Sequence, residues 1–194
     1  MSVRVISGMA KGRQLRVRQV AGLRPTSDRA RETLFNILAS RVPGARFLDM
    51  FAGSGAVGIE ALSRGAAAAV FIEQDAGVVA QLEANLELCR FAAPAIVVRG
   101  SWQRALQRVR TTEEPFDIAF LDPPYDWAEA HTCLEVIHEH GMVSPDGVAV
   151  VEHRFSQAPP LAVGWELFRR VDVGDTAFSI FAMVGGSKTL DSRA

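Results

Sequence analysis

Between residues 46 and 152, apolar segments of strand length alternate with segments that have helical periodicity. Alternation at this spacing predicts a mostly parallel sheet with helices on both faces. A turn at Gly174-Asp175 then separates two more strands, which we expect to pair as an antiparallel hairpin at the sheet edge. The expected strands are Arg46–Met50, Ala68–Glu73, Ala95–Arg99, Phe116–Leu121, Val148–Glu152, Trp165–Val171 and Ala177–Val184, and the expected helices are 55–64, Val78–Cys89, Trp102–Arg110 and Ala128–His140.

The residues before this alternating region predict a hairpin and one helix. Strands at Val3–Ile6 and Gln14–Val20 are joined by a glycine-containing turn, and in the second strand arginines alternate with apolar residues. An amphipathic helix should follow Pro25, with Thr26 or Ser27 as its N-cap, and end near Pro43-Gly44. We expect three regions: a basic hairpin extension (1–22), a catalytic domain (23–185) and a disordered tail (186–194).

Composition excludes several classes of protein. A chain of 194 residues, 48% of them hydrophobic, is long enough to bury a core without disulfides or a structural metal. Cys89 and Cys133 have no partners at metal-ligand spacing, so we expect two reduced core thiols in a cytoplasmic protein. No apolar run reaches the roughly 18 residues that cross a bilayer. Secretion and membrane insertion are therefore not expected.

The charge of the chain is strongly asymmetric. Residues 1–46 contain ten basic and two acidic residues, a net charge of +8, whereas the whole chain carries −1. Such an asymmetry favours a basic arm that contacts a polyanion, with nucleic acid as the first candidate, although a solvated basic surface has the same composition.

A glycine-rich motif, FLDMFAGSGAVGIEAL, follows the first expected sheet strand. Gly53, Gly55 and Gly58 have the G-x-G-x-x-G spacing of nucleotide-binding turns, and Glu73 ends the next strand, where its carboxylate could bind ribose hydroxyls. A nicotinamide dinucleotide and S-adenosylmethionine both fit this pattern. Asp49 favours S-adenosylmethionine, because a carboxylate suits its cationic methionine end and would repel a pyrophosphate.

A second motif, DIAFLDPPY, places Asp122 at the carboxyl end of a buried strand, where open α/β sheets bind ligands. Pro123 and Pro124 lack N–H donors and stiffen the turn, so carbonyl oxygens can face a ligand. The Asp122 carboxylate and the Pro123 carbonyl could hold the hydrogens of an exocyclic amino group, and Tyr125 could stack on the base.

With these motifs in place, the chain resembles the bacterial 16S ribosomal RNA guanine-N2 methyltransferase family, the RsmD-like enzymes. The resemblance extends from Val3 to Met183, and the DPPY motif is shared with DNA adenine and cytosine methyltransferases. Four blocks carry it: GMAKGRQL, LRPTSDRARETLFN, LDMFAGSGAVGIEALSRGA and LDPPY. The resemblance implies a class I methyltransferase fold, a seven-stranded, mostly parallel sheet with an antiparallel last strand.

The resemblance also implies roles for individual residues. The catalytic residues would be Asp122, Pro123, Pro124 and Tyr125, with no metal ion. The S-adenosylmethionine site would comprise Thr26, Ser27, Asp49, Phe51, Ala52, Gly53, Ser54, Gly55, Glu73, Ser101 and Trp102. The RNA-binding residues would be Lys11, Arg13, Arg16, Arg18 and Arg24. Ser101 departs from the Asp or Asn that relatives use to bind adenine, and Trp102 could equally cap the next helix against the core.

The implied reaction is methyl transfer to the N2 of a guanine in 16S ribosomal RNA, within the small subunit or an assembly intermediate, by a cytoplasmic monomer. Catalysis would depend on positioning and electrostatics.

A DNA adenine-N6 methyltransferase would use the same catalytic residues, but the chain has no room for a separate domain that recognises DNA sequence. A nicotinamide-dependent oxidoreductase would leave DPPY unexplained. We expect surface or capping roles for His131, His138 and His140, and assign none to His153.

Overall fold

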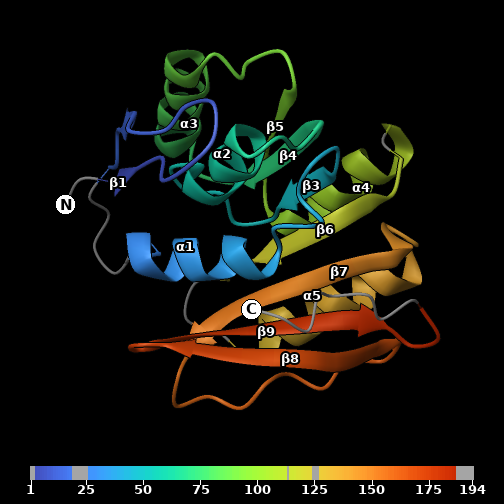
Figure 1. Ribbon diagram of the computed structural model, residues 1–194. Helices are drawn as coiled ribbons and strands as arrows, with labels where there is room; N and C mark the ends of the chain where they lie inside the picture. The colour runs from blue at the N-terminus through green and yellow to red at the C-terminus, as the bar shows by residue number, and fades with distance from the viewer. Residues whose placement is uncertain (1–2, 19–25, 113, 124–126, 187–194) are drawn as a thin grey trace.

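The structure is a computed structural model of the chain and describes residues 3–18, 26–112, 114–123 and 127–186 (Figure 1). A seven-stranded sheet forms its centre, in the order β5-β4-β3-β6-β7-β9-β8. The first five of these strands pair in parallel, and β9 pairs antiparallel with both neighbours. The strands are β3 (Arg46–Asp49), β4 (Ala68–Glu73), β5 (Ala95–Arg99), β6 (Phe116–Leu121), β7 (Val143–Arg154), β8 (Trp165–Val173) and β9 (Thr176–Met183).

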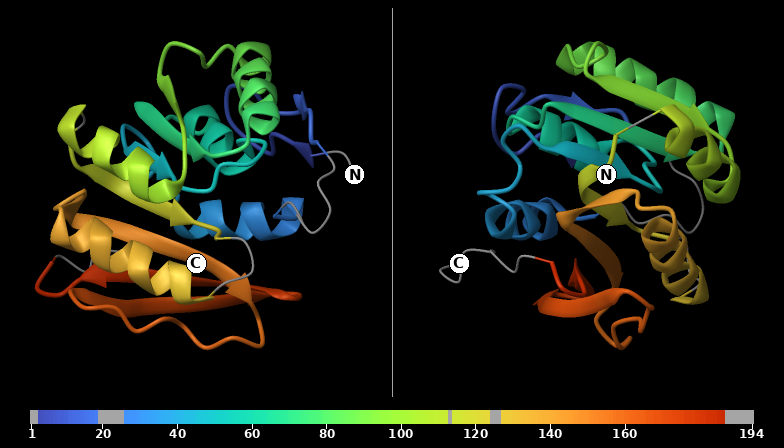
Figure 2. Two further views of the ribbon diagram at one scale, coloured as in Figure 1. Left: turned by 180° about the vertical axis from the view of Figure 1, so that it is seen from behind. Right: turned by 90° about the vertical axis from the view of Figure 1, so that its right-hand side faces the viewer.

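Helices cover both faces of the sheet (Figure 2). One core cluster joins the sheet to α1 (Asp28–Ile37), α2 (Ala56–Ser63) and α3 (Ala76–Cys89). A second cluster on the opposite face joins it to α4 (Trp102–Thr112) and α5 (Trp127–Glu139). The prediction of a mostly parallel sheet with two helical layers, an edge hairpin and an antiparallel last strand is confirmed.

The N-terminal hairpin is an arm that packs against α2. Its strands, β1 (Val3–Arg4) and β2 (Gln14–Leu15), are shorter than expected, but their antiparallel pairing is confirmed. The buried carboxylate of Glu60 accepts hydrogen bonds from the amides of Ile6 (2.7 Å) and Ser7 (3.0 Å). The buried hydroxyl of Ser63 accepts one from the Ala10 amide (2.9 Å). Buried carboxylates require such partners, so the arm and α2 stabilise each other.

Strand β7 is the element that differs most from expectation, since it begins at Val143, five residues before the expected Val148. Residues 144–147, Ser-Pro-Asp-Gly, have the composition of a turn, yet here they form an irregularity in the pairing with β6 between Phe116 and Ile118. A Cβ on Gly147 would lie 3.0 Å from the carbonyl oxygens of Phe116 and Asp117. Glycine therefore allows the bulge to pack against the neighbouring strand.

Candidate functional site

Four carboxylates form a row across the carboxyl ends of four neighbouring strands. Glu73 ends β4, Asp49 ends β3, Asp122 follows β6, and Glu152 lies near the end of β7. Side chains two residues apart along a strand share a face, and the preceding Phe71, Phe47, Phe120 and Val150 all belong to the core beneath α1–α3. The four carboxylates therefore face the same side. We define Glu73, Asp49, Asp122 and Glu152, in sheet order, as the carboxylate row.

The strand registers fix the spacing within the row. Leu121 is paired with Val151, so Asp122 and Glu152 lie side by side on adjacent strands. Asp49 is paired with Phe71 and Phe120, and it therefore lies two residues behind Glu73 and Asp122. Adjacent strands are about 4.8 Å apart, so the row spans roughly 14 Å. This edge is where open α/β sheets bind their ligands, as the sequence predicted for Asp122.

Burial disfavours the ionised forms of Asp49, Asp122 and Glu152, and the charges of neighbouring carboxylates add to this at Asp49 and Glu152. Burial raises the pKa of Asp49 to about 7, and the charges of Asp122 and Glu73 act in the same direction. Burial also raises the pKa of Asp122 to about 7. The pKa of Glu152 is raised well above its usual range by burial and by the charge of Asp122. A cationic ligand bound at such a site would stabilise the ionised forms of these carboxylates.

The glycine loop lies between Asp49 and Glu73 and is held by both. Gly53 donates its amide hydrogen to Glu73 Oε2 (3.0 Å), and Gly58 donates to Asp49 Oδ2 (3.1 Å). The Phe51 amide also bonds to Asp49. Ala52 is buried, Phe51 and Ser54 are partly buried, and the Ala52 amide donates to the Ile72 carbonyl (2.9 Å). Two carboxylates thus fix the loop and still face the site.

The three glycines of the motif have different structural roles. A Cβ on Gly55 would lie 2.2 Å from Leu82 Cδ1, and one on Gly58 would lie 2.2 Å from the Phe71 ring. Both glycines therefore allow α2 to pack closely. Gly53 has a φ of +52°, and a Cβ there would meet no atom within 4 Å. Close approach of a ligand to the backbone is thus a role that Gly53 can perform.

The DPPY segment is described only in part, because Pro124 and Tyr125 lie outside the described residues. Asp122 and Pro123 are partly buried. Of the described residues, none donates a hydrogen bond to the Asp122 carboxylate. This carboxylate can therefore accept hydrogen bonds from a ligand. The predicted amine clamp, in which Asp122 and the Pro123 carbonyl hold the hydrogens of an exocyclic amino group, requires such a free acceptor.

Glu152 is a candidate that the sequence prediction missed. Thr26 donates a hydrogen bond from Oγ1 to Glu152 Oε2 (2.7 Å), which brings the start of α1 to the end of β7. Arg31, also on α1, is fully buried and attracts Glu152 electrostatically. The Ser27 hydroxyl accepts a hydrogen bond from the Ala30 amide (3.2 Å) and is the N-cap of α1. Of the two predicted residues, Thr26 thus contacts the carboxylate row.

Ser101 and Trp102, the predicted adenine contacts, lie at the start of α4. Ser101 is partly buried, and its carbonyl accepts the Ala105 amide hydrogen of α4 (2.9 Å). Trp102 packs into the core beneath α4 and α5. Its ring Nε1 is buried and has no hydrogen-bond partner within the described parts of the chain. Most of the Trp102 ring is therefore buried by packing within the core. A contact of Ser101 or Trp102 with adenine stays a prediction.

The predicted RNA-binding residues line the exposed side of the arm, apart from Arg24, which lies outside the described residues. Lys11, Arg13, Arg16 and Arg18 are exposed, whereas Leu15 is buried and Val17 partly buried. Arg18 pairs with Asp75, the N-cap of α3 beyond Glu73 (Nη1 to Oδ1, 3.3 Å). The basic side chains thus extend from the arm to the rim of the site.

Asn85, a fully buried side chain of α3, joins the arm to the glycine loop. It accepts a hydrogen bond from the Arg16 amide (2.9 Å) and donates to the carbonyls of Arg16 (3.0 Å) and Ser54 (2.9 Å). No feature of the sequence identified this connection, because its partners are 31 and 69 residues away.

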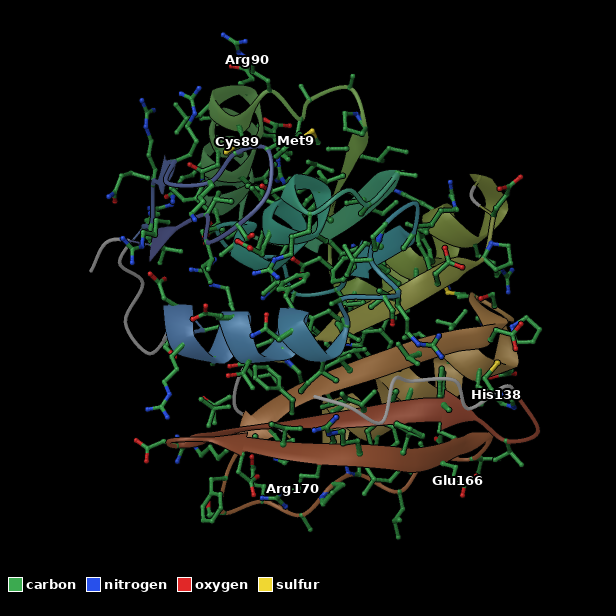
Figure 3. All side chains as sticks on the ribbon, viewed as in Figure 1. Met9, Cys89, Arg90, His138, Glu166 and Arg170 are labelled. Atoms are coloured by element: carbon green, nitrogen blue, oxygen red, sulfur yellow. The ribbon has the colours of Figure 1, made fainter. Side chains whose placement is uncertain are left out.

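His153 and the two cysteines are buried in the core. His153 Nε2 lies 2.7 Å from Ser179 Oγ and Nδ1 lies 2.9 Å from the Arg154 carbonyl, within the sheet and on the face opposite to Glu152. Cys89, on α3 in Figure 3, and Cys133 are buried free thiols. Across the described ranges, no three His, Cys, Asp or Glu side chains are grouped to hold a metal ion. No described helix has the length and hydropathy to cross a membrane.

Comparison with known proteins agrees with this geometry. The model of a family described as "Conserved hypothetical protein 95" matches residues 3–182. Ribosomal RNA small subunit methyltransferase D of Escherichia coli K12 is 38% identical over 180 residues, which are 92% of this chain and 89% of the relative. The protein of the same name from Haemophilus influenzae is 33% identical and covers 92% of this chain and 93% of its own length.

Solved structures extend the likeness to three dimensions. The structure of yhhF from Escherichia coli has a TM-score of 0.81 and 37% identity, and the match covers 94% of this chain and 98% of that one. An RNA methyltransferase from Salinibacter ruber, solved in complex with S-adenosyl-L-homocysteine, has a TM-score of 0.66 at 18% identity and shares the fold. The family model, the relatives and the fold agree: this chain belongs to the conserved hypothetical protein 95 family, which includes the ribosomal RNA small subunit methyltransferase D proteins, as the resemblance indicated.

Proposed function

We propose that the protein transfers a methyl group from S-adenosylmethionine to the exocyclic N2 of a guanine in 16S ribosomal RNA. The observation that carries the proposal is the carboxylate row beside the glycine loop. Three of its members have raised pKa values, so the site favours a cation. S-adenosylmethionine has a sulfonium and an ammonium group, whereas a nicotinamide dinucleotide would bring an anionic pyrophosphate to the same carboxylates.

The residues present fit this cofactor. Glu73 accepts three backbone hydrogen bonds and would use its remaining acceptor capacity for a ribose hydroxyl. Asp49, one strand further, would face the methionine end with Thr26. Gly53, which has free space at its Cα, would admit the cofactor close to the backbone. Ser101 and the backbone around it would contact adenine.

When bound, S-adenosylmethionine supplies the methyl group, as the sulfur–methyl bond breaks with its electron pair staying on sulfur. The chain's own residues prepare the acceptor. Asp122 and the Pro123 carbonyl would accept hydrogen bonds from the N2 amine and orient its lone pair towards the methyl carbon. The new N–C bond would use this lone pair, and the methylated amine would then transfer one proton to the Asp122 carboxylate that it contacts. Positioning of this kind contributes a large part of the rate.

The arm would hold the substrate RNA. Its arginines and Lys11 are exposed beside the rim of the site and would contact phosphates, which position an RNA without distinguishing its sequence. The named relatives are ribosomal RNA small subunit methyltransferases, so the proposed partner is 16S ribosomal RNA, within the small subunit or an assembly intermediate.

The test is methyl transfer from radiolabelled S-adenosylmethionine to three substrates. These are small subunits from a strain lacking the enzyme, purified ribosomal RNA, and duplex DNA. Digestion and mass spectrometry of the product should show N2-methylguanosine in small-subunit RNA. N6-methyladenine in DNA would establish the alternative activity. A rise in melting temperature with NAD and none with S-adenosylmethionine would contradict the proposed cofactor.

A further inference from the structure

The carboxylate row has one more member than cofactor binding and the amine clamp require. Glu73 and Asp49 hold the glycine loop, and Asp122 is assigned to the target amine. Glu152 lies on the far side of Asp122, level with it on the adjacent strand. Its Oε2 accepts the Thr26 hydroxyl hydrogen, and no described residue donates a hydrogen bond to Oε1. Within the described parts of the chain, the Asp122 carboxylate and Glu152 Oε1 are therefore two adjacent acceptors without a donor.

The order of the strands indicates which part of a bound base Glu152 would contact. The glycine loop and Glu73 place the cofactor over β3 and β4, so the row leads from the cofactor through Asp122 on β6 to Glu152 on β7. With the methyl donor over β3 and β4, a base whose amine is held by Asp122 would extend towards β7. The atoms next to that amine would then face Glu152, which is adjacent to Asp122.

We propose that Glu152 selects guanine by accepting a hydrogen bond from its N1–H while Asp122 accepts one from the neighbouring N2 amine. This inference rests on the proposed guanine-N2 methylation and adds the residue that determines the base. On the Watson–Crick edge of guanine, the N1–H and N2–H donors lie next to each other. The discrimination requires the ionised form of Glu152, whose pKa is raised by burial; the nearby Arg31 charge and an N1–H donor both favour that form. Adenine has an N1 lone pair beside its N6 amine, so it would leave the ionised carboxylate without a donor. The pair of acceptors thus distinguishes two bases that DPPY alone does not.

The surroundings of Glu152 hold it in place for this role. The Thr26 hydroxyl fixes one carboxylate oxygen at 2.7 Å and leaves the other for the base. Arg31 is a buried residue of α1 and donates hydrogen bonds to Asp28 (2.6 Å) and the Arg4 carbonyl (3.0 Å), so its charge is fixed near Glu152. Thr26 is accordingly a positioning residue, whereas Glu152 itself contacts the substrate.

The experiment compares two bases at the methylated position in reconstituted small subunits. Guanosine is compared with 2-aminopurine riboside, which keeps the C2 amine but has an N1 lone pair in place of N1–H. The wild type should prefer guanosine by about 100-fold in kcat/KM, because 2-aminopurine leaves the carboxylate without a donor. In Glu152→Gln, the amide can donate to the N1 lone pair, so the preference should fall to about tenfold or less. The matched control is Glu166→Gln on the edge strand β8 (Figure 3), which should keep the wild-type preference.

The ratio of the two substrates cancels any difference in the amount of folded enzyme, so a purely structural role of Glu152 would leave it unchanged. An unchanged preference in Glu152→Gln would overturn the inference. If that variant has no turnover, the ratio of equilibrium affinities for the two subunits provides the same test. Failure of the proposed function looks different, because the wild type would then form no N2-methylguanosine at all.

Discussion

Replacing Asp49 by asparagine should change how the stability of the ligand-free protein depends on pH. Asp49 is 1% exposed, and burial raises its pKa to about 7 from 3.8. The native state therefore keeps a proton on this carboxyl at pH values where the unfolded chain has lost it. Stability must then fall as pH rises from about 4 to about 7, because the native state has to accommodate a buried negative charge.

The size of the effect follows from the shift in pKa. About three pKa units at 1.36 kcal/mol each correspond to about 4 kcal/mol. That is a large part of the 5–15 kcal/mol by which domains of this kind are stable. Asparagine has nearly the same shape and can still accept the Gly58 amide hydrogen, but it does not titrate. The variant should therefore lose up to about 4 kcal/mol less stability than the wild type across this range.

The assay is urea unfolding of both proteins at pH 4, 5, 6, 7 and 8. The difference between the two curves removes the contributions of other groups, such as His153, whose lowered pKa acts in the opposite direction. Equal pH dependence in wild type and Asp49→Asn would refute the reasoning that ionisation of the buried Asp49 carboxyl destabilises the native state. Saturating S-adenosylmethionine should reduce the difference, since its cationic groups favour the ionised carboxylate.

Three further outcomes are expected. Asp122→Ala should reduce single-turnover methyl transfer by about a hundredfold to a thousandfold while calorimetry shows cofactor affinity within about tenfold of wild type, and transfer within threefold of wild type would exclude the clamp. Gly55→Val should lower the free energy of unfolding by several kcal/mol because of the clash with Leu82, whereas Gly53→Ala should cost about 1 kcal/mol and mainly weaken cofactor binding; equal stabilities would contradict the separate roles. Replacing Arg13, Arg16 and Arg18 by glutamine should lower the slope of log affinity for the small subunit against log salt by about two, and parallel lines would show that these arginines contact no phosphates.

The parallel strands β4, β5 and β6 were predictable from the sequence because each is an apolar run bounded by clear helical periodicity. β4, β5 and β6 begin and end at the predicted residues. β7 was underestimated because Pro145 and Gly147 indicate a turn, whereas the structure accommodates them in a bulge. Local composition does not show whether such residues end a strand or interrupt its pairing.

The candidate site was predictable where its residues are close in sequence, as in the glycine loop and the DPPY segment. Glu152 was not, because a glutamate at a strand end is common and becomes informative only when β7 pairs with β6. Its partners Asp122 and Thr26 are 30 and 126 residues away. The same reason applies to Asn85, whose connection between the arm and the glycine loop depends on the packing of α3.

The docking of the arm has a consequence for biosynthesis. The arm is joined by hydrogen bonds to Glu60 and Ser63 across 53 to 56 residues, and to Asn85 across 69. During translation, which proceeds at about 5–20 residues per second, the arm must therefore wait several seconds before α2 and α3 exist. Throughout that time Arg18 lacks its partner Asp75, on a nascent chain that emerges from a particle made largely of RNA. This positively charged segment is thus made before the helices that hold it in the fold exist.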